Sequence, residues 1–126
     1  MTEGLSESQE QIYLFQWAEL NRRRMPELGL LFHVPNGGKR SIATARRLKA
    51  EGVKAGVPDL CLPVARGGWH GLFIELKRAG GGRATEQQRE WIGALEKEGY
   101  RAVVCHGWEA AAEELARYLK EENEEW

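Results

Sequence analysis

Two acidic residues and one lysine near the middle of the chain have the types and spacing of a reaction centre. Asp59 follows Gly56-Val57-Pro58, and Glu75 and Lys77 share one face of the apolar run at residues 71–77, because side chains alternate along a strand. A hairpin loop at residues 66–70 is expected to bring Asp59 beside Glu75. Two converging carboxylates suit Mg²⁺, and a neighbouring lysine can activate a water or stabilise charge on a phosphate. Together these groups suffice to hydrolyse a phosphodiester bond.

The same residues also fit a plainer interpretation. Glu75 and Lys77 are the pattern of an ion pair on an exposed strand, and Asp59 after Pro58 is a common turn residue. Because short motifs often occur by chance, spacing alone leaves both interpretations open.

The pattern of apolar residues predicts the elements that must position these groups. Helices are expected over residues 5–24, 41–51, 85–98 and 108–120, and strands over residues 30–34, 59–64, 71–77 and 100–105. Ser41 is expected to cap the second helix, with Ile42, Ala45 and Leu48 facing inward. The order α-β-α-β-β-α-β-α predicts an α/β fold, a small mixed sheet flanked by helices.

The length of 126 residues predicts one domain over residues 1–120, followed by an acidic tail over residues 121–126. The net charge of −1 hides an uneven distribution, since residues 109–126 hold seven of the 19 acidic residues and two of the 18 basic ones. Residues 39–54 contain six basic residues against Glu51 alone. Such a basic stretch is typical of a phosphate-binding surface or of an ordinary solvated helix face.

Several functional classes are excluded by what the sequence lacks. There is no apolar run of about 20 residues to cross a membrane and no signal-peptide pattern. Cys61 and Cys105 make no ligand pattern, and there is no zinc motif or P-loop. We therefore expect a cytoplasmic protein with reduced cysteines.

The ordered motifs resemble the VRR-NUC (virus-type replication-repair nuclease) domain family of the PD-(D/E)XK nuclease superfamily. The resemblance is carried by Gly-Val-Pro-Asp-Leu at 56–60, Ile-Glu-Leu-Lys at 74–77, and Gln-Arg-Glu-Trp at 88–91 leading to Gly99. Residues 33–40 and 48–52 are also similar to stretches of that family, so the match runs from about residue 6 to 106. It implies a restriction-endonuclease-like core. Stand-alone members of this size are typically phage or prophage proteins, which act in the cytoplasm of a bacterial host.

The resemblance also implies roles for individual residues. Asp59, Glu75 and the backbone carbonyl of Leu76 would bind Mg²⁺ or Mn²⁺, and Lys77 would be the catalytic lysine. Gln88 would face the metal site or orient a water. Its plainer role is in a capping box with Thr85, and both roles can hold together.

The family uses a glutamate of the first helix as well. Glu7 is the preferred residue, because Glu7 and Gln11 match the family's E-x-x-x-Q pattern, and Glu10 is the alternative. Either carboxylate would also favour the N-terminus of a helix electrostatically.

Four polar residues are predicted to contact DNA phosphates beside the metal site: Asn36, Lys39, Arg40 and Arg46. The alternative for residues 35–38 is a simple turn.

The sequence thus predicts a divalent-metal-dependent DNA endonuclease. Small stand-alone relatives resemble Holliday-junction resolvases, so cleavage of branched or four-way DNA by a homodimer is expected. The alternatives are a DNA-binding module that keeps the fold without turnover, and an accessory protein that acts through its acidic tail. Near-neutral net charge does not exclude DNA, because an empty metal site is itself negative. It predicts binding that depends on metal and on salt.

Overall fold

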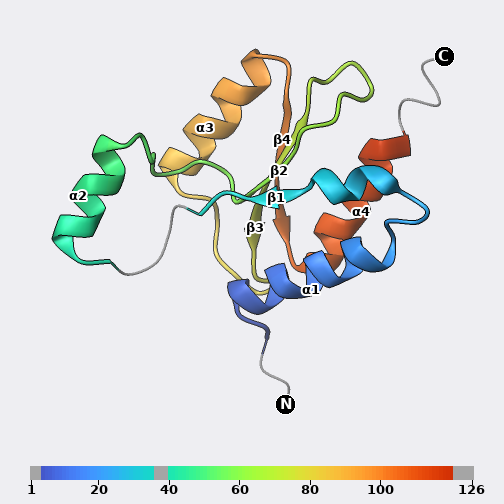
Figure 1. Ribbon diagram of the computed structural model, residues 1–126, viewed down its shortest axis with the longest axis horizontal. Coiled ribbons are helices and arrows are strands. Elements are labelled where there is room, and N and C mark those ends of the chain that lie inside the picture. Colours follow the sequence, from blue (N-terminus) through green and yellow to red (C-terminus); the bar gives the residue numbers. More distant parts are fainter. Residues whose placement is uncertain (1–3, 36–39, 121–126) are drawn as a thin grey trace.

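Four strands form one mixed sheet with helices on both faces (Figure 1). The computed structural model describes residues 4–35 and 40–120. Its elements are, in chain order, helix α1 (Glu7–Leu20), the 3-10 helix η1 (Pro26–Leu30), strand β1 (Phe32–His33), helix α2 (Ile42–Ala50), strands β2 (Leu60–Leu62) and β3 (Leu72–Lys77), helix α3 (Glu86–Lys97), strand β4 (Arg101–His106) and helix α4 (Trp108–Lys120). The expected α/β class, a mixed sheet flanked by helices, is confirmed.

The strands lie in the order β1-β2-β3-β4. β1 pairs antiparallel with β2, and β2 antiparallel with β3, whereas β3 and β4 are parallel and are joined through α3. Leu60 is paired with Ile74. Continued by one residue, this register sets Asp59 opposite Glu75.

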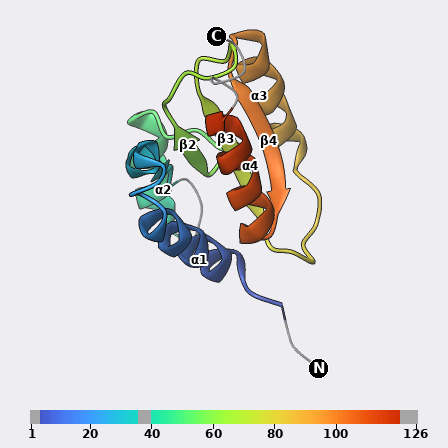
Figure 2. The ribbon, with the colours of Figure 1, turned by 90° about the vertical axis from the view of Figure 1, so that its right-hand side faces the viewer.

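The two faces of β3 have different surroundings. Leu72, Ile74 and Leu76 are at most 2% exposed and belong to the core, which α1 and α4 complete with side chains such as Leu14 and Leu115. Figure 2 shows α4 lying across the sheet on this face, with α1 beside it. On the opposite side of the sheet α3, which has no buried residue, packs against β4 and reaches Glu75 of β3 through Gln88. The site-bearing face is therefore the more open one.

The buried side of α1 contains one charged residue. Its buried residues are Glu10, Leu14 and Ala18, which lie one turn apart on one side of the helix. Ser6 and Gln9 form the capping box that starts it. The helix ends at Leu20, and the predicted extension to residue 24 is a turn.

α2 departs most from expectation. Ser41 caps it as predicted, but the helix has no buried residue. The predicted inward orientation is wrong for Ile42 and Ala45, which are exposed, whereas Leu48 is half-buried. Ile42 is 73% exposed. Helical periodicity defines an apolar side, but no element within the described residues buries it. α2, which connects β1 to β2 in the sequence, projects away from the rest of the molecule as an arm (Figure 1).

Two strands are shorter than predicted. η1 takes up residues 26–30, so β1 keeps only Phe32 and His33 of the expected 30–34. β2 keeps residues 60–62 of the expected 59–64, because the chain turns away into the hairpin loop, where Arg66 and Trp69 form an isolated bridge. None of the described helices has the length and apolar character needed to cross a membrane.

Candidate active site

Asp59 and Glu75 come together beside the start of β2. The sheet register places them opposite one another on the antiparallel strands β2 and β3. The carboxylate of Asp59 accepts a hydrogen bond from the backbone N–H of Leu76, with an N to Oδ2 distance of 2.9 Å. Because this donor belongs to β3 itself, the side chain of Asp59 is fixed toward Glu75 by the sheet.

Lys77 and Gln88 converge on the same carboxylate. The Nζ atom of Lys77 lies 3.7 Å from Oε2 of Glu75, and the lysine side chain is 12% exposed. Nε2 of Gln88 donates to the same Oε2 at 2.9 Å. The Oε1 atom of Gln88 accepts from the backbone N–H of Thr85 at 2.8 Å, closing the capping box of α3. Gln88 thus serves the helix start and the carboxylate at once.

Glu75 is held in an environment that opposes its negative charge. It is 2% exposed, and its Oε1 atom has no hydrogen-bond partner in the described part of the chain. Burial is the largest cause that raises the pKa of Glu75, to about 8. The charge of Asp59 adds to the increase, and the ammonium of Lys77 opposes it. Without a cation, the surroundings of Glu75 therefore favour its protonated form.

This donor set fits a small divalent cation. A buried carboxylate oxygen without a donor, facing a second carboxylate, is a position that a cation would satisfy. No group of three His, Cys, Asp or Glu side chains within residues 4–35 and 40–120 is arranged to hold a metal. Two carboxylates with a backbone carbonyl match Mg²⁺, which keeps several waters, better than they match a metal caged by side chains.

Two further groups orient Asp59 through its backbone carbonyl. The N–H of Val34 donates to this oxygen at 2.7 Å, and Nδ1 of His33 lies 3.0 Å from it. Sequence reasoning assigned no such role to either residue, nor one to the Leu76 N–H as a donor. The pairing of β1 with β2 could have indicated them, but a two-residue strand leaves too weak a sequence pattern to give its register.

The two candidate glutamates of α1 lie in different surroundings. Glu7 is exposed on the first turn, and its charge contributes to the raised pKa of Glu75. Glu10 is 2% exposed and accepts from the backbone N–H of Ala79 at 3.0 Å and from that of Trp108 at 2.9 Å. Glu10 therefore ties α1 to the end of β3 and to the start of α4.

The predicted DNA-binding residues are placed only in part. Arg46 is exposed on α2, and Arg40 is exposed just before it. Asn36 and Lys39 lie outside the described residues, as does the predicted acidic tail at residues 121–126.

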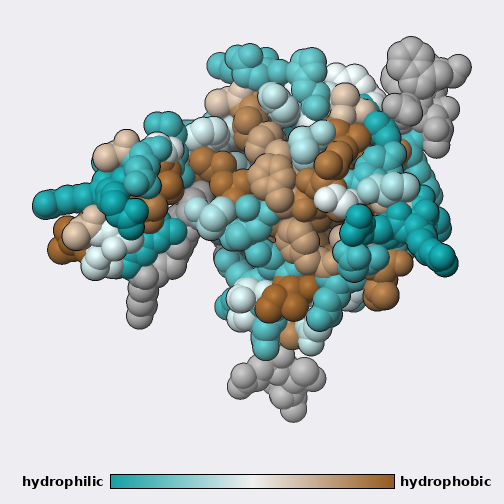
Figure 3. Space-filling view, in the orientation of Figure 1, coloured by the Kyte–Doolittle hydropathy of each residue, from teal (hydrophilic) through white to brown (hydrophobic). Residues whose placement is uncertain are grey.

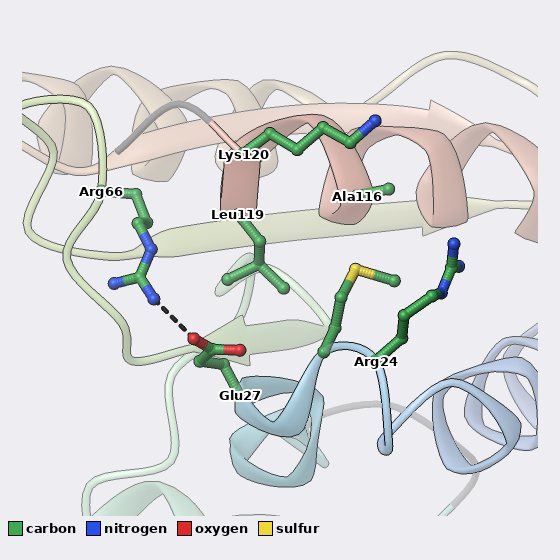
Figure 4. Close-up of a pocket in the computed structure, with 7 residues that line it drawn as sticks. Arg24, Glu27, Arg66, Ala116, Leu119 and Lys120 are labelled. Carbon is green, nitrogen blue, oxygen red and sulfur yellow. Dashed lines mark hydrogen bonds and ion pairs between the residues drawn. The ribbon is translucent and has the colours of Figure 1, made fainter. Parts of the chain in front are cut away.

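Away from these residues, a pocket of about 380 Å³ lies between η1, the hairpin loop and the end of α4 (Figure 4). Arg24, Arg66 and Lys120 surround it, and Arg66 pairs with Glu27 at 2.7 Å. It has no pair of carboxylates beside a lysine, so it is not the reaction centre.

Comparison with known proteins agrees with this geometry. The model of the VRR-NUC domain matches residues 5–109. A solved structure described as "VRR_NUC domain protein" is 36% identical in sequence, with a TM-score of 0.81 over 95% of this chain and 93% of that chain. No curated protein matches the chain. The resemblance expected from the sequence is confirmed, and the chain belongs to the VRR-NUC domain family, whose members are nucleases that process DNA.

Proposed function

We propose that this protein is a Mg²⁺- or Mn²⁺-dependent endodeoxyribonuclease that hydrolyses phosphodiester bonds. The observation that carries the proposal is the buried Glu75 carboxylate, opposite Asp59 and 3.7 Å from the ammonium of Lys77. A buried carboxylate with one oxygen, Oε1, left without a hydrogen-bond partner in the described part of the chain would be costly in a merely structural position. A carboxylate pair that requires a cation, next to a lysine, is instead suited to phosphate chemistry.

Asp59, Glu75 and the carbonyl of Leu76 would hold the divalent ion. When bound, the ion supplies Lewis-acid polarisation of a phosphate oxygen and lowers the pKa of a coordinated water. The two carboxylates would balance the positive charge of the ion, and the Leu76 N–H keeps the side chain of Asp59 in position.

Lys77 and Gln88 have separate tasks in this arrangement. The Lys77 ammonium, held beside Glu75, orients the attacking water and stabilises negative charge that develops on the phosphate. Gln88 donates to Oε2 of Glu75 and thereby fixes the carboxylate for its ligand role. Glu7 adds negative charge at the edge of the site, where it favours a cation.

The preferred substrate is proposed to be branched DNA, and the active form a homodimer. A single domain of this size positions DNA through phosphate contacts, which carry no sequence information. Arg40 and Arg46, with Asn36 and Lys39, are the proposed phosphate contacts. Twofold pairing would present two sites to two opposed strands of a four-way junction. Exposed apolar side chains such as Ile12 and Phe32, 53% and 48% exposed, are available for such pairing.

The test is cleavage of linear, flap, splayed and four-way DNA of one sequence, with Mg²⁺ and with Mn²⁺. Wild type is expected to cut, and to introduce paired nicks in the junction. Lys77→Ala and Asp59→Asn are expected to abolish cleavage and to keep most of the DNA affinity, because affinity is mainly phosphate electrostatics. Lys97→Ala is a matched control, since Lys97 lies at the far end of α3 from Gln88, about 13 Å along the helix axis.

Three outcomes would contradict parts of this proposal. A wild type that binds DNA and cuts none with either metal would identify a non-catalytic DNA-binding module. A strictly monomeric protein that cuts only linear ends would exclude the junction resolvase. Loss of function on deletion of residues 121–126, with Lys77→Ala fully active, would favour action through the acidic tail.

A further inference from the structure

A cavity of about 550 Å³ lies between the end of α2, the segment before β2 and helix α3. Its apolar lining comes from Val34, Pro35, Val53, Val57 and Trp91, and Glu51, Gly52 and Lys54 complete it at the end of α2. The volume falls within the range of sites that bind small organic molecules, and apolar and aromatic linings are typical of such sites.

The residues that line this cavity are connected to the candidate active site through the backbone and through α3. Val57 lies two residues before Asp59, and the N–H of Val34 donates to the carbonyl of Asp59 at 2.7 Å. Trp91 lies three residues after Gln88, so both occupy one side of α3 on neighbouring turns. The cavity lining therefore adjoins the two segments that carry Asp59 and Gln88.

The cavity wall is held in place rather than loosely folded. Gly56 has a φ of +92°, and a Cβ atom there would approach the backbone of Gln87 to 3.0 Å. The segment that leads to Asp59 therefore packs directly against the first turn of α3. Trp91 projects from the next turn and is half-buried, so its indole contributes to the cavity surface.

The surroundings of the cavity favour a polyanion. Arg46, Arg47 and Lys49 are exposed on α2, and Arg47 neutralises the rim carboxylate of Glu51 across 3.6 Å. Figure 3 shows the largely hydrophilic α2 lobe projecting from the body of the molecule. A basic groove that follows a nucleic-acid backbone, with an aromatic ring for a base, is the usual composition of a site for unpaired nucleotides.

We propose that this cavity binds one unpaired nucleobase of the DNA substrate, stacked on Trp91, beside the phosphate that is cut. This inference rests on the proposed function and adds its substrate class: DNA with an unpaired or frayed nucleotide at the cleavage position. The binding is tolerant of sequence, because every base offers a π-face to the indole. The cavity thereby distinguishes branched from continuous duplex DNA without reading bases.

The test measures binding apart from cleavage. Fluorescein-labelled duplexes with one unpaired nucleotide, carrying either a base or an abasic site there, are titrated in Mg²⁺ with Lys77→Ala protein and followed by fluorescence anisotropy. In this background, loss of the base is expected to weaken binding about tenfold, which corresponds to the stacking of one base. Adding Trp91→Leu should abolish the preference for the base, and Trp91→Phe should keep most of it. Tyr13→Leu changes an exposed aromatic residue of α1 and should have no effect on the preference.

Two results would overturn the inference. One is an unchanged preference for the base in Trp91→Leu protein with a wild-type circular dichroism spectrum. The other is loss of self-association on Trp91→Leu in sedimentation, with equal affinity for base and abasic DNA, which would make the cavity a surface for a second copy of the chain. A preference for the base that depends on Trp91 supports the cavity even where wild type cuts no DNA. Failure of the nuclease proposal is thereby distinguished from failure of this one.

Discussion

Removal of the ionisable group at Glu75 is expected to change how the stability of the metal-free protein depends on pH. Burial and the charge of Asp59 raise the pKa of Glu75 from 4.5 to about 8. The folded protein therefore holds a proton that the unfolded chain has released between these values. Stability falls with rising pH wherever the native state binds more protons. The contribution of Glu75 is thus fully present below pH 4.5 and is lost as the pH rises through about 8.

The change in stability caused by the titration of Glu75 has an upper limit. The interval from 4.5 to about 8 corresponds to at most about 5 kcal/mol, at about 1.4 kcal/mol for each pH unit. Since small domains are stable by about 5–15 kcal/mol, such a change is a large fraction of the total. Glu75→Gln keeps the shape of the side chain and has no proton to lose, so it should be more stable than wild type at pH 9.

The assay is urea unfolding in EDTA between pH 5 and pH 9, followed by circular dichroism. Wild type should lose stability across this range, whereas Glu75→Gln should show a much flatter dependence. Glu90→Gln, at an exposed position of α3, serves as a control and should follow wild type. Excess Mg²⁺ should restore the stability of wild type at pH 9, since it binds the ionised carboxylates. An equal pH dependence in wild type and Glu75→Gln would refute the reasoning.

Three other predictions concern the fold that holds the site. Glu10→Gln should lower the free energy of unfolding in urea by about 2 kcal/mol, because the single oxygen of an amide cannot replace two carboxylate oxygens that each accept from a backbone N–H. Glu7→Gln, at an exposed position, should change it by no more than about 0.5 kcal/mol. Equal effects of the two substitutions would contradict the structural role given to Glu10. Burial alone would raise the pKa of Glu114, but hydrogen bonds from two arginines outweigh it and lower the pKa. Stability from Glu114 should therefore be lost as the pH falls below 4.5, and Glu114→Gln should remove that acid-side loss in a thermal melt series. Gly99→Ala should destabilise by about 1–3 kcal/mol, because the φ is +91° and a Cβ would meet His70 at 2.6 Å. Gly93→Ala, in open space on α3, should stabilise by about 1 kcal/mol in the same melts, and a gain at both glycines would contradict this account.

The sheet and the carboxylates could be predicted because local patterns determine them. Alternation along residues 71–77 separates the core face from the face of Glu75 and Lys77, and the hairpin fixes which residue Asp59 opposes. The start of α3 at Thr85 follows from its capping box, which also delivers Gln88 to the site. These signals all lie within residues 59–88.

The features that could not be predicted depend on contacts between distant residues. Glu10 accepts from backbone groups 69 and 98 residues away, and no local pattern indicates that its carboxylate is buried. The apolar side of α2 has the spacing of a packed helix, but periodicity does not show whether another element will cover it. η1 begins at Pro26, a residue that predicted the end of a helix and gave no sign that a 3-10 helix would start there.

The isolation of α2 also has a consequence for how such nucleases can diversify. The arm buries none of its own side chains, so its sequence and length can change with little cost to the folding of the core. Both of its connections nevertheless return to the neighbourhood of Asp59, through Val34 and through Val57. Substitutions in the arm can therefore accumulate while the contacts that hold Asp59 and Glu75 stay unchanged. If Arg40 and Arg46 contact DNA as proposed, such substitutions would alter the preferred DNA substrate without altering the reaction centre.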